Sequence, residues 1–191
     1  LVIAVSQSGE TADLLSALKE VDCPVLSIVN VVGSTLARNS NHNMYVNAGP
    51  EIGVASTKAF TAQLTVLKLL ALTMQENLSE ARNSLLETSQ KIEPMLKQNE
   101  EKINEIAEYI AEKDDIYFIG RNRGRELAKE ASLKLKELSY IHSEAFPGGE
   151  FKHGTLSLIE EGVPVFAFLT DDKSATLSNA IEAGSRGADL I

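Results

Sequence analysis

Three charged residues, Glu130, Lys134 and Glu137, recur at spacings of four and three, which places them on one stripe of a predicted helix. An apolar stripe lies about 90° away round the same helix and consists of Leu127, Ala131, Leu135 and Leu138. The charged stripe is therefore predicted to border the buried face, where it would flank a cleft. On spacing alone, an ordinary ladder of surface ion pairs is the favoured interpretation.

A break in the chain follows this helix, because Pro147, Gly148 and Gly149 come shortly before His153. Glycines let a backbone approach a ligand closely. A histidine on a loop or short turn can titrate near neutral pH. A lone histidine is more often structural than catalytic, but this setting makes His153 a candidate for acid-base chemistry.

A second polar stretch carries three hydroxyl side chains, Ser6, Ser8 and Thr11, between an apolar run at 1–5 and a predicted helix at 12–20. The start of a helix favours anions, because its first N-H groups are unpaired and the helix dipole points at them. A simple N-cap is the alternative. Three hydroxyls and a glycine within six residues favour a phosphate cradle.

A third polar stretch, residues 51–58, leads into a predicted helix at 59–75. Ser56 and Thr57 stand at the start of that helix. They are either helix caps or a second set of ligand donors.

The elements that must position these residues alternate between strands and helices, which predicts an α/β fold with doubly wound parallel sheets flanked by helices. The first apolar run is expected to be a strand buried on both faces. The other strands are expected at residues 24–30, 44–47, 116–121, 140–145 and 163–169, and a last helix at 174–183.

The chain divides into three parts by composition. Residues 1–77 and 115–191 each combine strands with polar loops, whereas residues 78–114 are charged and amphipathic and are expected to form a helical connector. Both ends of the chain look like buried strands. Natural domains usually end in exposed polar segments, so we expect a piece of a longer protein with both lobes truncated.

Composition weighs against several classes of protein. Eighteen basic and 27 acidic residues give a net charge of -9, so a nucleic-acid partner is not expected. No run reaches the roughly 18 apolar residues of a membrane span. Cys23, the single cysteine, predicts a reducing, cytoplasmic compartment and a small buried side chain at the start of a strand. The histidines show no metal-ligand spacing, and no metal or other cofactor is expected.

Four motifs together resemble one known family. They are Ser6-Gln7-Ser8-Gly9-Glu10-Thr11, residues 51–60, Leu133-Lys134-Leu135-Lys136-Glu137 and residues 150–154. Over nearly the whole chain, and in order, they are similar to the isomerase part of glutamine:fructose-6-phosphate amidotransferase, the glucosamine-6-phosphate synthase. The resemblance implies tandem sugar isomerase (SIS) domains, with the later part of the first at 1–77 and the earlier part of the second at 115–191.

The resemblance also implies ligands. The substrate would be fructose 6-phosphate or glucosamine 6-phosphate. Four residues would hold its phosphate, namely Ser6, Gln7, Ser8 and Thr11. Val54 and Ser56 would contact the sugar.

Catalytic roles are implied in the same way. Glu137 would be the base that moves a proton between C1 and C2, Lys134 its neighbour in the site, and His153 the group that helps to open the sugar ring. In the family this histidine reaches the site of the adjacent subunit, which implies a homodimer. A glutaminase domain in the parent chain would supply ammonia.

Two stretches depart from the family pattern. Phe146-Pro147-Gly148-Gly149 stands where the family commonly has Tyr-Ala-Ala-Gly, and Ala131-Ser132 replaces a Gly-Ala pair. Hinge stiffness and helix packing are therefore expected to differ at these positions.

Two other functions stay open at this point. One is another SIS enzyme, such as a sugar-phosphate isomerase or a deglycase. The other is a non-catalytic SIS module that binds a sugar phosphate to regulate a partner. The Glu137 and His153 pair argues against the module, because a sensor needs the hydroxyl loop but no acid-base groups.

Overall fold

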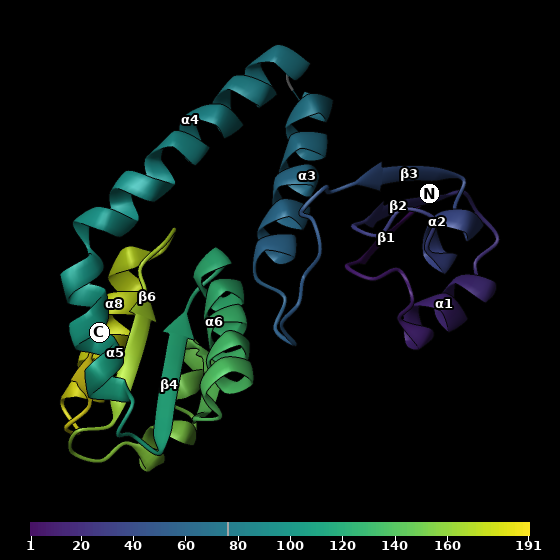
Figure 1. The fold of residues 1–191 in the computed structure, drawn as a ribbon. Coiled ribbons are helices and arrows are strands. Elements are labelled where there is room, and N and C mark those ends of the chain that lie inside the picture. The colour runs from purple at the N-terminus through teal and green to yellow at the C-terminus, as the bar shows by residue number, and fades with distance from the viewer. Residues whose placement is uncertain (76) are drawn as a thin grey trace. The chain divides into compact units, whose positions relative to one another are not determined.

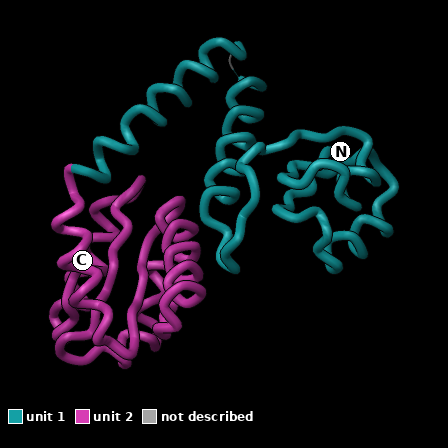
Figure 2. Tube along the Cα trace, viewed as in Figure 1, with its two compact units in different colours: residues 1–97 teal, residues 98–191 magenta. Residues whose placement is uncertain are grey.

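The structure, a computed structural model, describes residues 1–75 and 77–191. The chain divides into two compact units, Leu1–Lys97 (unit 1) and Gln98–Ile191 (unit 2), which Figure 2 distinguishes by colour. Each unit contains a parallel sheet of its own. Most of the elements are labelled in Figure 1.

Unit 1 is built on a three-stranded parallel sheet in the order β1-β2-β3. The strands are β1 (Val2–Ser6), β2 (Val25–Val29) and β3 (His42–Tyr45). The helices α1 (Ala12–Lys19) and α2 (Thr35–Asn39) connect them. Because the strands are parallel, their carboxyl ends meet at one edge, and the loops that follow them lie together there.

The two connecting helices cover one face of this sheet. The core on that face consists of Ala4, Val25, Val29, Leu36 and Ala37, with Leu14, Leu15 and Leu18 packed against it. On the opposite face Ile3 and Val5 are 44% and 38% exposed. The prediction that the first strand is buried on both faces is therefore wrong, because side chains alternate along a strand and α1 and α2 lie on the same face.

The prediction for Cys23 is also wrong, since this cysteine is exposed. Cys23 lies between α1 and β2, and β2 begins two residues later at Val25. The cysteine is thus outside the sheet, in the turn that leads into it.

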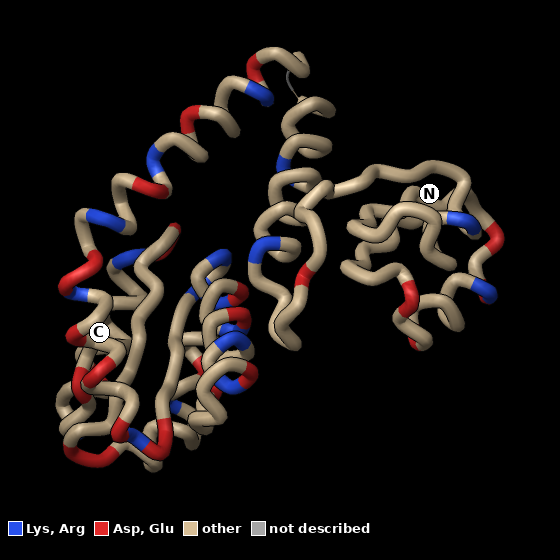
Figure 3. The backbone as a smooth tube through the Cα atoms, in the orientation of Figure 1, with Lys and Arg blue, Asp and Glu red and all other residues tan. Residues whose placement is uncertain are grey.

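Three helices follow β3 along the chain. They are α3 (Lys58–Gln75), α4 (Leu78–Gln98), which contains Pro94, and α5 (Glu100–Ile110). Charges of both signs alternate along α4, as Figure 3 shows. The division into two lobes and a connector at 78–114 stays a prediction. Within the part of the chain that the structure describes, no helix has both the length and the apolarity that crossing a bilayer requires.

Unit 2 is built on a four-stranded parallel sheet in the order β5-β4-β6-β7. Its elements in chain order are β4 (Asp115–Gly120), α6 (Arg123–Ser139), β5 (His142–Pro147), α7 (Gly148–Phe151), the 3-10 helix η1 (Thr155–Leu158), β6 (Pro164–Phe168), α8 (Lys173–Gly184) and β7 (Asp189–Leu190). Successive side chains of β4 enter two different cores, one beneath α6 and one beneath α7 and α8. The predicted doubly wound α/β class is confirmed.

Small residues form the buried face of α6, namely Gly124, Ala128 and Ser132. The Ser132 hydroxyl donates a hydrogen bond to the Ser143 carbonyl at 3.0 Å. A Cβ on Gly124 would lie 2.7 Å from the Phe168 carbonyl oxygen. The helix therefore approaches the sheet with its backbone.

This close approach corrects the predicted apolar stripe. Ala131 and Leu135 are half-buried, as expected, but Leu127 and Leu138 are 44% and 63% exposed. The small residues occupy the centre of the contact, so the larger apolar side chains at both ends of the stripe stay outside it.

The predicted strand at 140–145 begins later, at His142. Tyr140 has a φ of 62° and ends α6 in the left-handed conformation, with its N-H donating to the Lys136 carbonyl at 3.1 Å. The chain must leave this turn before it can pair with β4.

Candidate functional site

The predicted phosphate loop joins the carboxyl end of β1 to the start of α1. The Ser6 hydroxyl accepts a hydrogen bond from the Gly9 N-H at 3.0 Å and lies 3.3 Å from the Thr11 hydroxyl. The Glu10 N-H donates to the Ser8 hydroxyl at 3.1 Å. Thr11 stands at the N-cap position, but its side chain makes no capping bond to α1 within the described residues. The N-cap alternative therefore does not account for the Thr11 hydroxyl.

Two contacts tie this loop to α2. Gly9 has a φ of +70°, and a side chain there would overlap that of Ser34, so the position requires glycine. Its carbonyl accepts the Leu36 N-H at 3.0 Å. The Glu10 carboxylate accepts the Thr35 N-H at 2.8 Å, and this hydrogen bond holds the pKa of Glu10 below its usual range. The start of α2 is thus occupied by a carboxylate of the protein itself.

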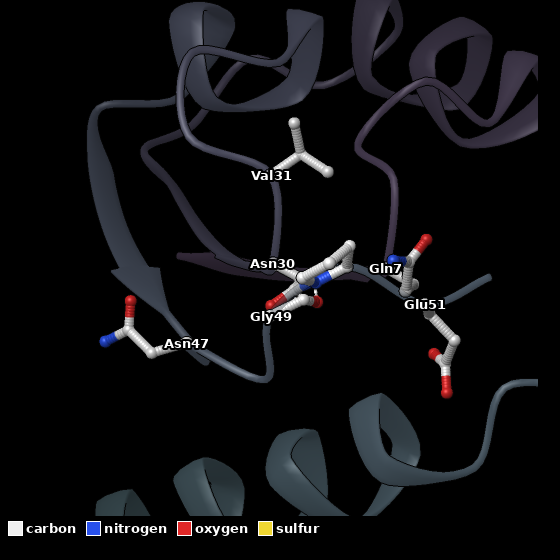
Figure 4. A pocket seen from close by; sticks show the side chains of 7 residues that line it. Gln7, Asn30, Val31, Asn47, Gly49 and Glu51 are labelled. Carbon is white, nitrogen blue, oxygen red and sulfur yellow. Dashed lines mark hydrogen bonds between the residues drawn. The ribbon is translucent and has the colours of Figure 1, made fainter.

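A pocket of about 510 Å³ lies at the carboxyl ends of the three strands of unit 1, a size typical of small-molecule sites. It is lined by Gln7, Asn30, Val31, Asn47, Gly49, Pro50 and Glu51. Figure 4 shows Gln7 and Glu51 on one side and Asn47 on the other. Asn30 shapes the wall, because its side chain donates to the Gly49 carbonyl at 2.7 Å and accepts the Ala48 N-H at 2.9 Å. Of the predicted site residues in the described part of unit 1, Gln7 alone lines this pocket.

Glu51 organises the loop between β3 and α3. Its carboxylate accepts the Thr57 N-H at 2.7 Å and the Ser56 hydroxyl at 3.1 Å. The hydrogen bond from the Thr57 backbone lowers the pKa of Glu51. Val54, inside this loop, is 97% exposed. The Ser56 hydroxyl thus belongs to a network around Glu51, and its contact with a sugar stays a prediction.

In unit 2, Lys134 joins two carboxylates on α6. Its Nζ lies 2.6 Å from Glu137 Oε2 and 3.5 Å from Glu130 Oε1. The three side chains are 21%, 29% and 26% exposed, whereas the Lys97–Glu93 pair on α4 is 72% and 77% exposed. The charged stripe therefore borders the buried face, unlike an ordinary surface ladder.

The protonation of Lys134 follows from these contacts. Partial burial acts to lower the pKa of Lys134, but the hydrogen bond to Glu137 and the charge of Glu130 outweigh it, and the pKa is raised. Lys134 therefore remains a cation beside the Glu137 carboxylate at neutral pH.

His153 lies in the exposed turn after α7, and its N-H donates to the Glu150 carbonyl at 2.9 Å. Its ring has no hydrogen bond or ion pair among the residues that the structure describes. The helix α6 has 17 residues and spans about 25 Å. It carries Lys134 and Glu137 toward the edge of the sheet that is opposite the carboxyl end of β5. The structure thus brings Lys134 and Glu137 together and leaves His153 out of contact with them in unit 2.

Sequence reasoning missed the roles of Glu51 and Asn30. Glu51 belongs to a recognised motif, and a carboxylate shortly before a helix start is a signal that could have identified it. Asn30 acts on residues 18 and 19 positions away, and no local pattern indicates such a contact.

Comparison with known proteins assigns the family. A profile of the SIS domain matches residues 1–73 and 109–191. The chain belongs to the SIS domain family.

Relatives of this SIS chain share one name. The glutamine–fructose-6-phosphate aminotransferase (isomerizing) of Clostridium perfringens is 44% identical over 204 residues, and that of Symbiobacterium thermophilum is 48% identical over 203 residues. Each match covers all of this chain and 33% of the relative, so the chain spans a third of the length of these curated relatives.

A solved structure agrees with this assignment. The C-terminal domain of glucosamine-fructose-6-phosphate aminotransferase from Francisella tularensis is 36% identical, with a TM-score of 0.82 over 98% of this chain and 57% of that one. The resemblance inferred from the four motifs is confirmed.

We expect the network around Glu51 to weaken at acidic pH. Because its folded-state pKa lies below the unfolded-state value of about 4.3, its contribution is fully present above that value and is lost as the pH falls through the lower, folded value. Hydrogen exchange at the Thr57 amide, corrected for the intrinsic pH dependence, should lose protection in that range. Glu51→Gln keeps an acceptor that does not titrate, so its Thr57 protection should not vary with pH. The same pH dependence in both proteins would contradict the prediction.

Proposed function

We propose that this chain forms part of the sugar-isomerising site of a glutamine–fructose-6-phosphate aminotransferase, the name that its curated relatives carry. The observation that carries the proposal is the partly buried Glu137 carboxylate, held 2.6 Å from Lys134 Nζ. A regulatory sugar-phosphate sensor has no need of such a pair. The relatives favour the aminotransferase over another SIS isomerase or a deglycase.

The longer protein would combine this site with a glutaminase domain that releases ammonia, and would make glucosamine 6-phosphate for hexosamine synthesis. A single cysteine is typical of a reducing compartment, which supports a cytoplasmic location.

The phosphate of fructose 6-phosphate would bind at the loop after β1. Ser6, Ser8 and Thr11 would donate from their hydroxyls and Gln7 from its amide, beside the unpaired N-H groups at the start of α1. The Thr11 hydroxyl makes no capping bond to α1 within the described residues, which supports this role. Val54 and Ser56 would contact the sugar itself.

The proton transfer would then use the pair on α6. Glu137 would take the proton from the carbon beside the carbonyl or imine and return it to the neighbouring carbon, so that the overall step neither gains nor loses a proton. The Lys134 ammonium group would stabilise negative charge that develops on the substrate. His153 would exchange a proton with the ring oxygen as the sugar opens.

The first expected result concerns the phosphate loop. Ser8→Ala combined with Thr11→Ala removes two hydrogen bonds to a charged group, each worth about 1.5–3 kcal/mol. Calorimetry on the full-length protein should therefore show at least about a tenfold weaker affinity for fructose 6-phosphate. Ser16→Ala, an exposed hydroxyl on α1, is the matched control and should bind normally. Unchanged affinity in the double variant would mean that the loop is only a helix start.

The second expected result concerns the base. Glu137→Gln keeps size and most hydrogen bonding but cannot accept the proton, so kcat should fall by about 10²- to 10⁴-fold while sugar-phosphate binding barely changes. Glu126→Gln, on the same helix and 64% exposed, should keep normal turnover. If Glu137→Gln retains kcat within about twofold, well short of the acid-base range, Glu137 is not the base and Glu130 becomes the candidate.

The third expected result is a two-fold dimer in which His153 serves the site of the other copy. Its exposed ring, unpartnered among the described residues, supports this arrangement. Light scattering on the full-length protein should give twice the mass of one chain. A monomer with full turnover would rule out the shared site and leave His153 a local role.

A further inference from the structure

The turn that carries His153 comes after α7, and α7 packs against a pair of side chains that have no role in the proposed chemistry. Arg121 comes directly after β4 and Asn179 lies on α8, and the Arg121 Nε donates to Asn179 Oδ1 at 3.1 Å. Asn179 is only 4% exposed and the Arg121 side chain 35% exposed, so this hydrogen bond is largely shielded from solvent. Asp172 Oδ2 lies 3.9 Å from Arg121 Nη1 and further orients the guanidinium group.

The first turn of α7 rests directly on this pair. A Cβ on Gly148 would lie 2.7 Å from Asn179 Oδ1 and 3.5 Å from Arg121 Cγ, and a Cβ on Gly149 would lie 3.1 Å from Arg121 Nη2. Neither glycine has a positive φ. Both positions therefore need glycine for space, because the backbone of α7 packs against the Arg121 and Asn179 side chains.

The rest of the turn is held at the residues just before His153. Phe151 is 1% exposed, with its ring centroid 6.2 Å from that of Tyr117, and Lys152 Nζ lies 4.0 Å from Glu182 Oε1. The imidazole itself has no partner in the described part of unit 2. The backbone of His153 is tied to α7 through its N-H, which donates to the Glu150 carbonyl, so the place from which the ring extends is set by how α7 is seated.

We propose that Arg121 and Asn179 are positioning residues that seat α7 and so fix the place of the His153 imidazole. Neither residue has a role of its own in the proposed chemistry. They act through the backbone of Gly148 and Gly149, which the hydrogen bond between them supports.

Histidine NMR tests this placement without reference to activity. The chain has three histidines, so each ring signal can be assigned: His42 in unit 1, His142 at the start of β5, and His153. Asn179→Ala should shift and broaden the His153 signal and leave the other two unchanged. Asn179→Asp retains an acceptor for Arg121 and should keep the original His153 signal. An unchanged His153 signal in Asn179→Ala, or an equal change at His142, would overturn the proposal.

Turnover of the full-length protein gives a second readout. Gly148→Ala and Asn179→Ala should each lower kcat, by up to about 10²-fold for a displacement of about 1 Å, with sugar-phosphate affinity unchanged. Asn179 Oδ1 occupies the space that the added methyl group needs, so the double variant should lose no more than the worse single variant. If the two losses of kcat multiplied in the double variant, Gly148 and Asn179 would act independently, which would contradict the proposal. Arg125→Ala and Ser178→Ala, exposed positions on α6 and α8, are matched controls.

This inference rests on the role proposed for His153, and His153→Ala separates the two. Full turnover in His153→Ala would refute that role, while the NMR signals would still support or overturn the positioning. Lost turnover in His153→Ala together with normal kcat in Gly148→Ala would overturn the positioning alone.

Discussion

The close packing of α6 against β4 is the constraint on which the geometry of unit 2 depends. A side chain on Gly120 would overlap the backbone of Gly124, and one on Gly124 would press on the Phe168 carbonyl. The helix can approach the sheet this closely only without Cβ atoms at the contact. Because each helical residue turns by a fixed angle, the position of this contact also decides where the stripe with Lys134 and Glu137 lies. Partial burial of that stripe strengthens the interaction between its charges relative to an exposed pair.

The loops before α1 and α8 carry different polar groups. In unit 1 the loop before α1 presents hydroxyl groups, which suits an anion from outside the protein. In unit 2 the loop before α8 presents carboxylates: Asp171 pairs with Arg123, and Asp172 accepts the Ala175 N-H at 3.4 Å. The start of α8 thus receives a carboxylate of the protein itself, as the starts of α2 and α3 do in unit 1. The unit 2 residues proposed for the chemistry lie instead on the side of α6 and in the turn after α7.

The α/β class, most elements and the motifs could be predicted from the sequence. The spacing of apolar residues, the polar loops and the charged stripe each depend only on residues close together in the chain. Contacts between distant residues could not be predicted. The exposure of Leu127 follows from the packing of Gly124 on Phe168, and these two residues are more than 40 positions apart in the chain. The pocket of unit 1 depends on the two hydrogen bonds that Asn30 makes across the end of the sheet. The left-handed Tyr140, which delays β5, belongs to a residue type for which a positive φ is uncommon.

The carboxylates at the helix starts of unit 1 have a consequence for the charge of any ligand. Glu10 occupies the start of α2 and Glu51 the start of α3, whereas Thr11 makes no side-chain capping bond to α1 within the described residues. Glu51 also lines the pocket. If the loop before α1 holds the phosphate as proposed, a sugar with one phosphate would bind favourably in a single direction, with its neutral end toward Glu51. A sugar bisphosphate would bring its second phosphate toward a like charge and lose part of the attraction that the first one provides.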